Sequence, residues 1–188
     1  MSFRLMLMAG SITAVLAGGA HATTFDVSGS PGAVPNFSIT AGGLTETYSS
    51  PAGNGFQVQN TAGLLSFSPA LVDNNFFGSD NLTISFSAPV SNEILIPFAI
   101  LDAFGTGDTL TATTNLGAST VFTTRNDALP LGEPEGLIAI VPSAAITSLT
   151  LSSSTAFAVG NTTVPEPMSL TLLGVGVLGA LAARRRHV

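Results

Sequence analysis

Short runs of alternating apolar and polar residues, separated by turn-forming residues, fill the middle of this 188-residue chain. In the clearest run, Leu82, Ile84 and Phe86 alternate with threonine and serine. Alternation with a period of two puts one set of side chains on each face of a strand, so the run predicts a half-buried β-strand. No amphipathic helical pattern of ten or more residues interrupts this region. The pattern therefore predicts an all-β domain of the sandwich or jelly-roll-like type.

Other runs in the same region fit that architecture. Residues 93–101 are almost uniformly apolar and predict a central strand buried on both faces, although Pro97 favours a bulge or an edge position. Residues 110–114 and 120–124 predict a hairpin that turns at Asn115-Leu116-Gly117. Further strands are expected at residues 137–141, 148–152 and 155–159, with weaker candidates at 24–27, 37–40, 44–48 and 56–59.

The N-terminal segment has the layout of a secretory signal peptide. Arg4 supplies a positive start, residues 5–17 are apolar, and Ala20-His21-Ala22 places small residues at the two positions that signal peptidase reads. We therefore expect residues 1–22 to be removed by signal peptidase at a site formed by Ala20 and Ala22. The exported domain would then span residues 23–163.

The C-terminal segment has three parts. Val164-Pro165-Glu166-Pro167 comes first, residues 168–183 follow without a charge, and Arg184, Arg185 and Arg186 stand near the end. As a helix, the uncharged run would be about 24 Å long, slightly less than a hydrocarbon core of about 30 Å. Basic residues beside a span favour the cytoplasmic side. We therefore predict a transmembrane helix, since a buried helix of a soluble domain would leave the three arginines unexplained.

These C-terminal features together resemble the PEP-CTERM sorting signal of Gram-negative bacteria. The resemblance implies that a membrane-embedded exosortase recognises Val164, Pro165, Glu166 and Pro167, that residues 168–183 form the span, and that Arg184–Arg186 form the membrane stop. Proteins with this signal are typically on the cell surface or extracellular and are linked to exopolysaccharide. The order of runs from residue 81 to 160 also resembles an ectodomain found in such proteins, except that Gly160-Asn161 stands where an Asp-Asn pair is common.

Charge excludes one class of partner. Between residues 23 and 163, Arg125 is the single basic residue against ten acidic residues. Nucleic-acid binding needs lysine or arginine to neutralise phosphates, so no nucleic-acid partner is expected. The chain contains no cysteine, which excludes disulfides.

The sequence offers no catalytic constellation. Its histidines, His21 and His187, fall in the signal peptide and the tail, so the exported domain would lack a histidine for a triad or for zinc. Glu133 and Glu135 flank Pro134 in an expected loop, where solvated carboxylates are a better interpretation than a glycosidase pair. We therefore expect a protein that is not an enzyme.

Calcium is the one ion that the residues suggest. Asp102 and Asp108 bracket a glycine-containing turn, and hard carboxylate oxygens suit Ca²⁺. Turn aspartates that bond to their own backbone are the favoured interpretation, so no cofactor is expected.

The sequence therefore predicts an exported surface or matrix protein, sorted by an exosortase, with a structural or adhesive role linked to exopolysaccharide. The alternative is a protein that binds or cleaves matrix polysaccharide and stays at the membrane.

Overall fold

A computed structural model describes residues 21–25, 36–50, 55–73, 80–101, 109–124 and 134–165 of the chain. The described strands belong to one compact unit that spans Ala20–Glu166. They are β1 (His21–Ala22), β2 (Asn36–Ala41), β3 (Leu44–Ser49), β4 (Phe56–Gln59), β5 (Ala70–Asp73), β6 (Leu82–Val90), β7 (Ile94–Ile100), β8 (Thr109–Thr114), β9 (Ser119–Thr123), β10 (Glu135–Ile140), β11 (Ile146–Ser153), β12 (Phe157–Val159) and β13 (Thr163–Val164). The described residues contain no helix, so the all-β prediction is confirmed.

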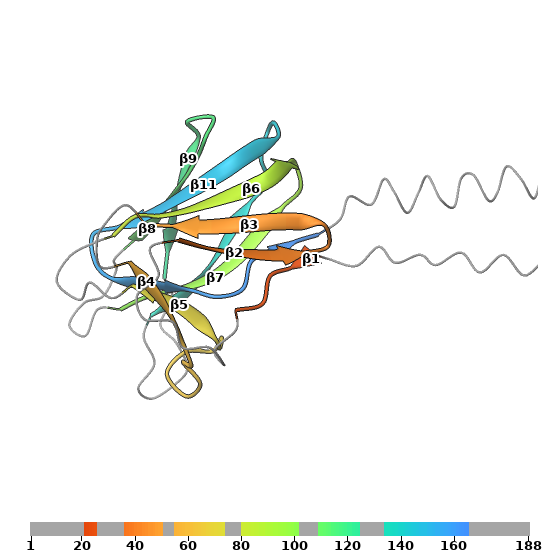
Figure 1. Cartoon of the computed structure of the whole chain (residues 1–188). Coiled ribbons are helices and arrows are strands. Elements are labelled where there is room, and N and C mark those ends of the chain that lie inside the picture. Colours follow the sequence, from red (N-terminus) through yellow and green to blue (C-terminus); the bar gives the residue numbers. More distant parts are fainter. Residues whose placement is uncertain are drawn as a thin grey trace, which may run out of the picture. The chain divides into compact units, whose positions relative to one another are not determined.

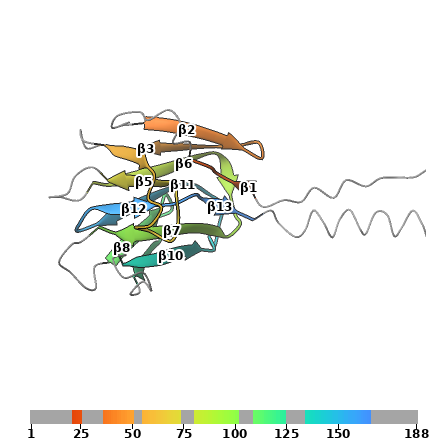
Figure 2. The same cartoon turned by 90° about the horizontal axis from the view of Figure 1, so that it is seen from below.

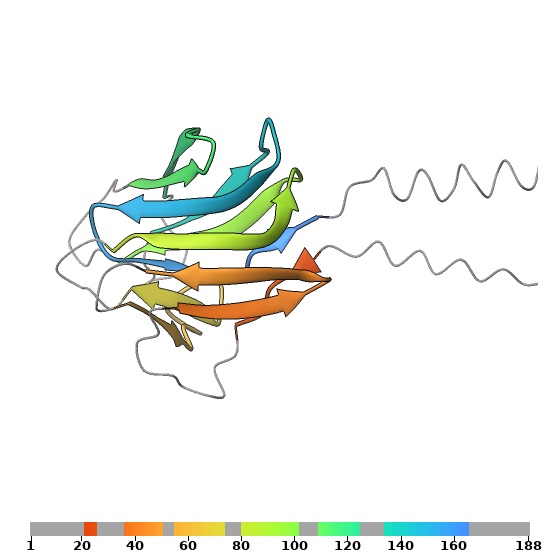
Figure 3. The same cartoon turned by 45° about the horizontal axis from the view of Figure 1, so that its top comes forward.

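These strands form two antiparallel sheets (Figure 1). Sheet B has the order β2-β3-β6-β11-β8-β9, and Figure 3 shows it as one continuous layer from the orange β2–β3 pair to the green β8–β9 pair. Its hairpins β2–β3 and β8–β9 close through glycines with positive φ, Gly42 and Gly43 in the first and Gly117 in the second. A left-handed turn costs glycine little, because it has no Cβ.

Sheet A is arranged around β7. On one side β7 pairs along its length with β10, and on the other side it pairs first with β12 and then with β13 (Figure 2). The sheet continues from β12 to β5 and β4, and from β13 to β1. β7 is therefore central, as its uniformly apolar sequence predicted.

Pro97 lies inside this central strand rather than at an edge. Its carbonyl accepts a hydrogen bond from the Gly160 N–H at 2.8 Å, but a proline has no N–H to return to Gly160. β12 ends at Val159, one residue before this point, and pairing with β7 resumes at Thr163. Pro97 therefore lacks its N–H at the point where the neighbouring chain passes from β12 to β13. The pairing of β7 with β10 on the other side is continuous.

The inward faces of the two sheets share one hydrophobic core. Ile84 and Leu149 of sheet B and Phe98 and Phe157 of sheet A are fully buried members of it. Each such side chain contributes about 1.5–3 kcal/mol by leaving water. A second, smaller cluster buries Ala99, Ala158 and neighbouring residues, with Leu65 and Phe67 packed against them. Sheet A is thus buried on both faces around β7, β12 and β5.

Several expected segments lie outside the described residues. They include residues 1–20 of the signal peptide, the expected membrane span 168–183 and the arginines that follow it. Within the described ranges, no helix is long and apolar enough to cross a membrane. β1 is described, and it begins two residues before the expected start of the exported domain at Thr23.

Gly136 of β10 gives a direct test of this packing. A Cβ built on Gly136 would lie 2.5 Å from the Phe98 ring, which is fully buried. We expect Gly136→Ala to lower the free energy of unfolding by about 1–3 kcal/mol, because the ring must move within a packed core. Urea denaturation of the Ala20–Glu166 fragment would measure this loss.

The matched control is Ala139→Ser, an exposed position on the same strand. It should change the free energy of unfolding by less than about 0.5 kcal/mol. Equal stability of the two variants would contradict the described contact between β10 and β7.

Candidate functional site: a buried polar network beside the sorting motif

The most unusual feature of the domain is a charged residue on an inward face. β3 alternates with a period of two, and this places Glu46 on the same buried face as Tyr48. Glu46 has no exposed surface, and Tyr48 has 1%. A carboxylate that leaves water must be compensated by hydrogen bonds or by an opposite charge. The side chains around Glu46 therefore define the site.

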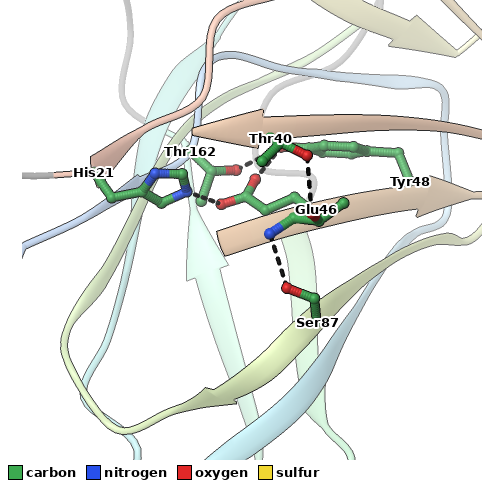
Figure 4. Close-up of polar contacts among 7 residues, drawn as sticks. His21, Thr40, Glu46, Tyr48, Ser87 and Thr162 are labelled. Carbon is green, nitrogen blue, oxygen red and sulfur yellow. Dashed lines mark hydrogen bonds and ion pairs between the residues drawn. The ribbon is translucent and has the colours of Figure 1, made fainter. Parts of the chain in front are cut away.

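Three side chains from distant parts of the sequence complete the network (Figure 4). The Tyr48 hydroxyl donates to Glu46 Oε2 at 2.6 Å, and His21 Nε2 lies 3.3 Å from Glu46 Oε1. The Tyr48 oxygen also lies 2.9 Å from Thr162 Oγ1. Since Tyr48 uses its one proton on Glu46, Thr162 is the donor in that bond. The network thus joins β1, β3 and the connection between β12 and β13.

His21 is held in this position by its backbone and by the turn beneath it. β1 pairs with β13, with His21 opposite Val164 and Ala22 opposite Thr163. A Cβ on Gly42 would lie 3.2 Å from His21 Nδ1. Gly42 therefore serves both the left-handed turn, at φ 55°, and the close approach of the imidazole. His21 keeps 8% of its surface exposed.

Backbone and aromatic contacts extend this anchoring to the residues after β1. The Thr23 N–H donates to the Thr162 carbonyl at 2.9 Å, and the Phe25 N–H donates to the Asn161 side chain at 3.1 Å. The Phe25 ring meets Tyr48 edge-on, with the ring centres 5.5 Å apart. Residues 21–25 are therefore attached to the segment that immediately precedes the sorting motif.

The network fixes the protonation state of its tyrosine. Burial raises the pKa of the Tyr48 phenol well above its ordinary value, and the adjacent Glu46 carboxylate raises that pKa further. Tyr48 therefore stays protonated and remains a hydrogen-bond donor at neutral pH. It is also enclosed, so it offers no face for stacking on a sugar ring.

Only some of the site residues predicted from the sequence are among the described residues. Val164 is 5% exposed and ends β13, and Pro165 follows it at a half-buried position. Ala22 is exposed in β1. Ala20, Glu166, Pro167, Arg184, Arg185, Arg186 and the candidate calcium ligands Asp102 and Asp108 lie outside the described residues. Within the described ranges, no group of three or more His, Cys, Asp or Glu side chains could hold a metal ion.

Glu135 is described, and Glu133 is not. The Glu135 carboxylate accepts a hydrogen bond from the Ser66 N–H at 2.5 Å and a second, very short one from the Ser66 hydroxyl. Glu135 also lines an open pocket of about 620 Å³ beside Val121, Phe122, Thr123, Gly136 and Leu137. Of these lining residues, Glu135 is the single acid, and its two oxygens are occupied by Ser66.

Sequence reasoning missed the network because it assigned His21 to the signal peptide. One signal was available: Glu46 stands two residues before Tyr48, at an inward position of an alternating strand. A charge at such a position requires a partner. The identity of that partner depends on the tertiary structure, because His21 and Thr162 lie near opposite ends of the domain's sequence and come together only in the fold.

The raised pKa of Tyr48 predicts how stability changes in alkali. Tyr48 is the single tyrosine, and the chain has no lysine or cysteine, so few other groups titrate in this range. Its pKa is higher in the folded state than in the unfolded state, where it is about 10. The stabilisation is therefore complete below about pH 10 and is lost as pH rises toward the folded pKa. Above about pH 10 the free energy of unfolding should fall by about 1.4 kcal/mol per pH unit.

Urea denaturation between pH 8 and pH 12 would measure this slope, and phenolate absorbance would follow Tyr48 directly. Tyr48→Phe should remove the slope while lowering stability at neutral pH, because Glu46 loses its donor. Ionisation of Tyr48 near pH 10 in the folded protein, with circular dichroism unchanged, would contradict the description of this site.

The pairing of His21 with Glu46 gives a second prediction. In the Ala20–Glu166 fragment, His21→Ala leaves a fully buried carboxylate without this partner. We expect the free energy of unfolding to fall by about 3 kcal/mol. The double variant His21→Ala/Glu46→Gln should lose less than the sum of the two single variants, because the two side chains are in contact.

Thr24→Ala is the control for that experiment, since Thr24 is an exposed neighbour in the same segment. It should stay within about 0.5 kcal/mol of the unaltered fragment. Equal effects of Thr24→Ala and His21→Ala in urea denaturation would show that the contact between His21 and Glu46 contributes nothing.

Comparison with known proteins identifies the C-terminal segment. No curated protein matches the chain significantly. One similar solved structure is a GH115 4-O-methyl-α-glucuronidase with specificity for decorated arabinogalactans, at 13% identity and a TM-score of 0.38, where the match covers 60% of this chain and 16% of that one. Another is an isomalto-dextranase of Arthrobacter globiformis T6 complexed with panose, at 14% identity and a TM-score of 0.35, covering 70% of this chain and 23% of that one.

The chain spans less than a quarter of either glycosidase, and at these scores neither likeness bears on its function. The family model of the PEP-CTERM protein-sorting motif, by contrast, matches residues 163–186. That match begins at the first residue of β13, whose partner strand carries His21. The segment that follows the sandwich is therefore a PEP-CTERM protein-sorting motif, as its sequence predicted.

Proposed function

We propose that this chain is an exported protein whose tail is read by an exosortase at the inner membrane. In this proposal its β-sandwich then acts at the cell surface or in the extracellular matrix. The observation that carries the proposal is the sorting motif at residues 163–186. Exosortase and signal peptidase are its processing partners, and the span 168–183 holds it in the membrane before processing.

The position of the motif supports this order of events. Val164 is buried in β13 and opposite His21, whereas Pro165 is the first residue after the strand. A cut before Val164 would remove part of the sheet. A cut after it leaves the hydrogen-bonded unit intact, so the released sandwich keeps all the contacts described for β13.

We propose a structural or adhesive role for the released domain, linked to exopolysaccharide, and no enzymatic activity. The described residues support this role because the side chains best suited to catalysis or to sugar stacking are buried. The His21, Glu46 and Tyr48 side chains, which are the groups that most resemble a catalytic set, are buried. Tyr48 donates a hydrogen bond to Glu46, and His21 lies 3.3 Å from Glu46. Tyr48 is the residue best suited to stack on a sugar, and it lies inside the aromatic cluster with Phe25 and Phe37.

The alternative is a protein that binds or cleaves matrix polysaccharide while it is retained at the membrane. Glu135 in its open pocket is the described carboxylate that this alternative would use. Glycoside hydrolysis usually needs a second carboxylate. Ser66 holds Glu135 through both of its oxygens, and this favours a structural role for that side chain.

Sorting is tested by changing the motif in the full chain. In a Gram-negative host that contains an exosortase, we expect Pro165→Ala/Glu166→Ala/Pro167→Ala to leave the tail attached, because the recognition residues are gone. Intact mass of the protein and its partition between membrane and medium would report the result. The unaltered chain should lose the tail and leave the membrane fraction.

Glu93→Ala is the matched control, because it removes the same charge from an exposed position outside the motif. It should be processed like the unaltered chain. Retention of residues 168–188 by the unaltered chain in that host would refute exosortase sorting. It would favour the membrane-retained alternative.

A further inference from the structure

We propose that signal peptidase cuts this chain between Ala20 and His21, so that the exported protein begins with His21. The proposal builds on export as proposed above and names a processing site two residues earlier than the Ala20-His21-Ala22 pattern suggests. As a consequence, the first residue of the exported domain is His21, whose imidazole contacts the buried Glu46 carboxylate.

The sequence before His21 permits this cut. Signal peptidase reads small residues at the first and third positions before the scissile bond. Gly18-Gly19-Ala20 meets that requirement as well as Ala20-His21-Ala22 does. The local pattern therefore allows both sites and does not choose between them.

The tertiary structure separates the two products. A domain that begins at His21 keeps β1, its pairing with β13, and the 3.3 Å contact between His21 Nε2 and Glu46 Oε1. A domain that begins at Thr23 loses all three. Glu46 then keeps the hydrogen bond from Tyr48 but has no imidazole beside its other oxygen, and the surface of Gly42 that His21 covers is exposed.

The new amino group differs between the products as well. Thr23 has no exposed surface, and its N–H is bonded to the Thr162 carbonyl. A cut before Thr23 would place a charged ammonium at this buried position, where it loses hydration. A cut before His21 places the ammonium at the start of a two-residue edge strand, on a residue that keeps 8% of its surface exposed, and leaves the hydrogen bond of the Thr23 N–H unchanged.

The N-terminus of the exported protein tests the proposal directly. The full chain would be produced in a Gram-negative host, and the N-terminal peptide of the exported form would be identified by mass spectrometry. We expect a peptide that begins His21-Ala22-Thr23. A peptide that begins at Thr23, or at any other residue, overturns the proposal while leaving export intact. A chain that keeps its leader and is not exported contradicts both this proposal and the proposed function.

Two matched substitutions locate the signal-peptidase cleavage site in a second, independent experiment. Gly18→Gln puts a long side chain at the third position before the proposed bond and should strongly reduce cutting before His21, so that the leader stays attached or the new N-terminus moves to Thr23. Ala22→Gln puts the same side chain immediately before the alternative bond, on a residue that is exposed in β1, and should be processed normally. The opposite pattern, with processing blocked by Ala22→Gln and not by Gly18→Gln, would locate the cut after Ala22 and refute the proposal.

Discussion

The hydrophobic core that β6 and β7 share is the feature on which the rest of the domain depends. β6 pairs with β3 and β11 in sheet B, and β7 pairs with β10, β12 and β13 in sheet A. Their inward residues, among them Ile84 and Phe98, are fully buried. Because side chains in such an interior fill space almost completely, both sheets are fixed relative to one another by these two strands. Every other strand is connected to this pair through the ladders of its sheet, with β4 and β9 the farthest away along them.

The polar network lies at one border of that core and serves a different purpose. It gains little stability as a buried contact, since the desolvation of Glu46 offsets most of what its polar neighbours return. It does specify which segments meet, because Glu46 contacts both His21 and Tyr48, and Tyr48 in turn contacts Thr162. The start of the described chain and the segment before the sorting motif are thereby attached to the same strand, β3. The two ends of the described unit are therefore held together on one strand of the sandwich.

Sequence patterns predicted strands best where alternation was regular and local. Leu82–Val90 and Ile146–Ser153 follow that rule, and the Thr109–Thr123 hairpin follows it through Gly117. β5 escaped prediction because Ala70–Asp73 is buried on both faces and shows no alternation. Pro97 was misleading for a related reason. Its missing N–H requires only that one neighbouring strand be interrupted, and the break between β12 and β13 meets that need inside a central strand.

By itself, the sequence determined the all-β class and the sorting motif, because both depend on residues close together in the chain: period-two alternation, turn glycines and the segment 163–186. Only the tertiary structure decided that His21 belongs to the domain and that Glu46 is buried beside it. Those residues are separated by the β2–β3 hairpin, and their contact arises from the pairing of β1 with β13. A pattern read along the chain cannot contain such a contact, since its partners are chosen by packing across the sheet.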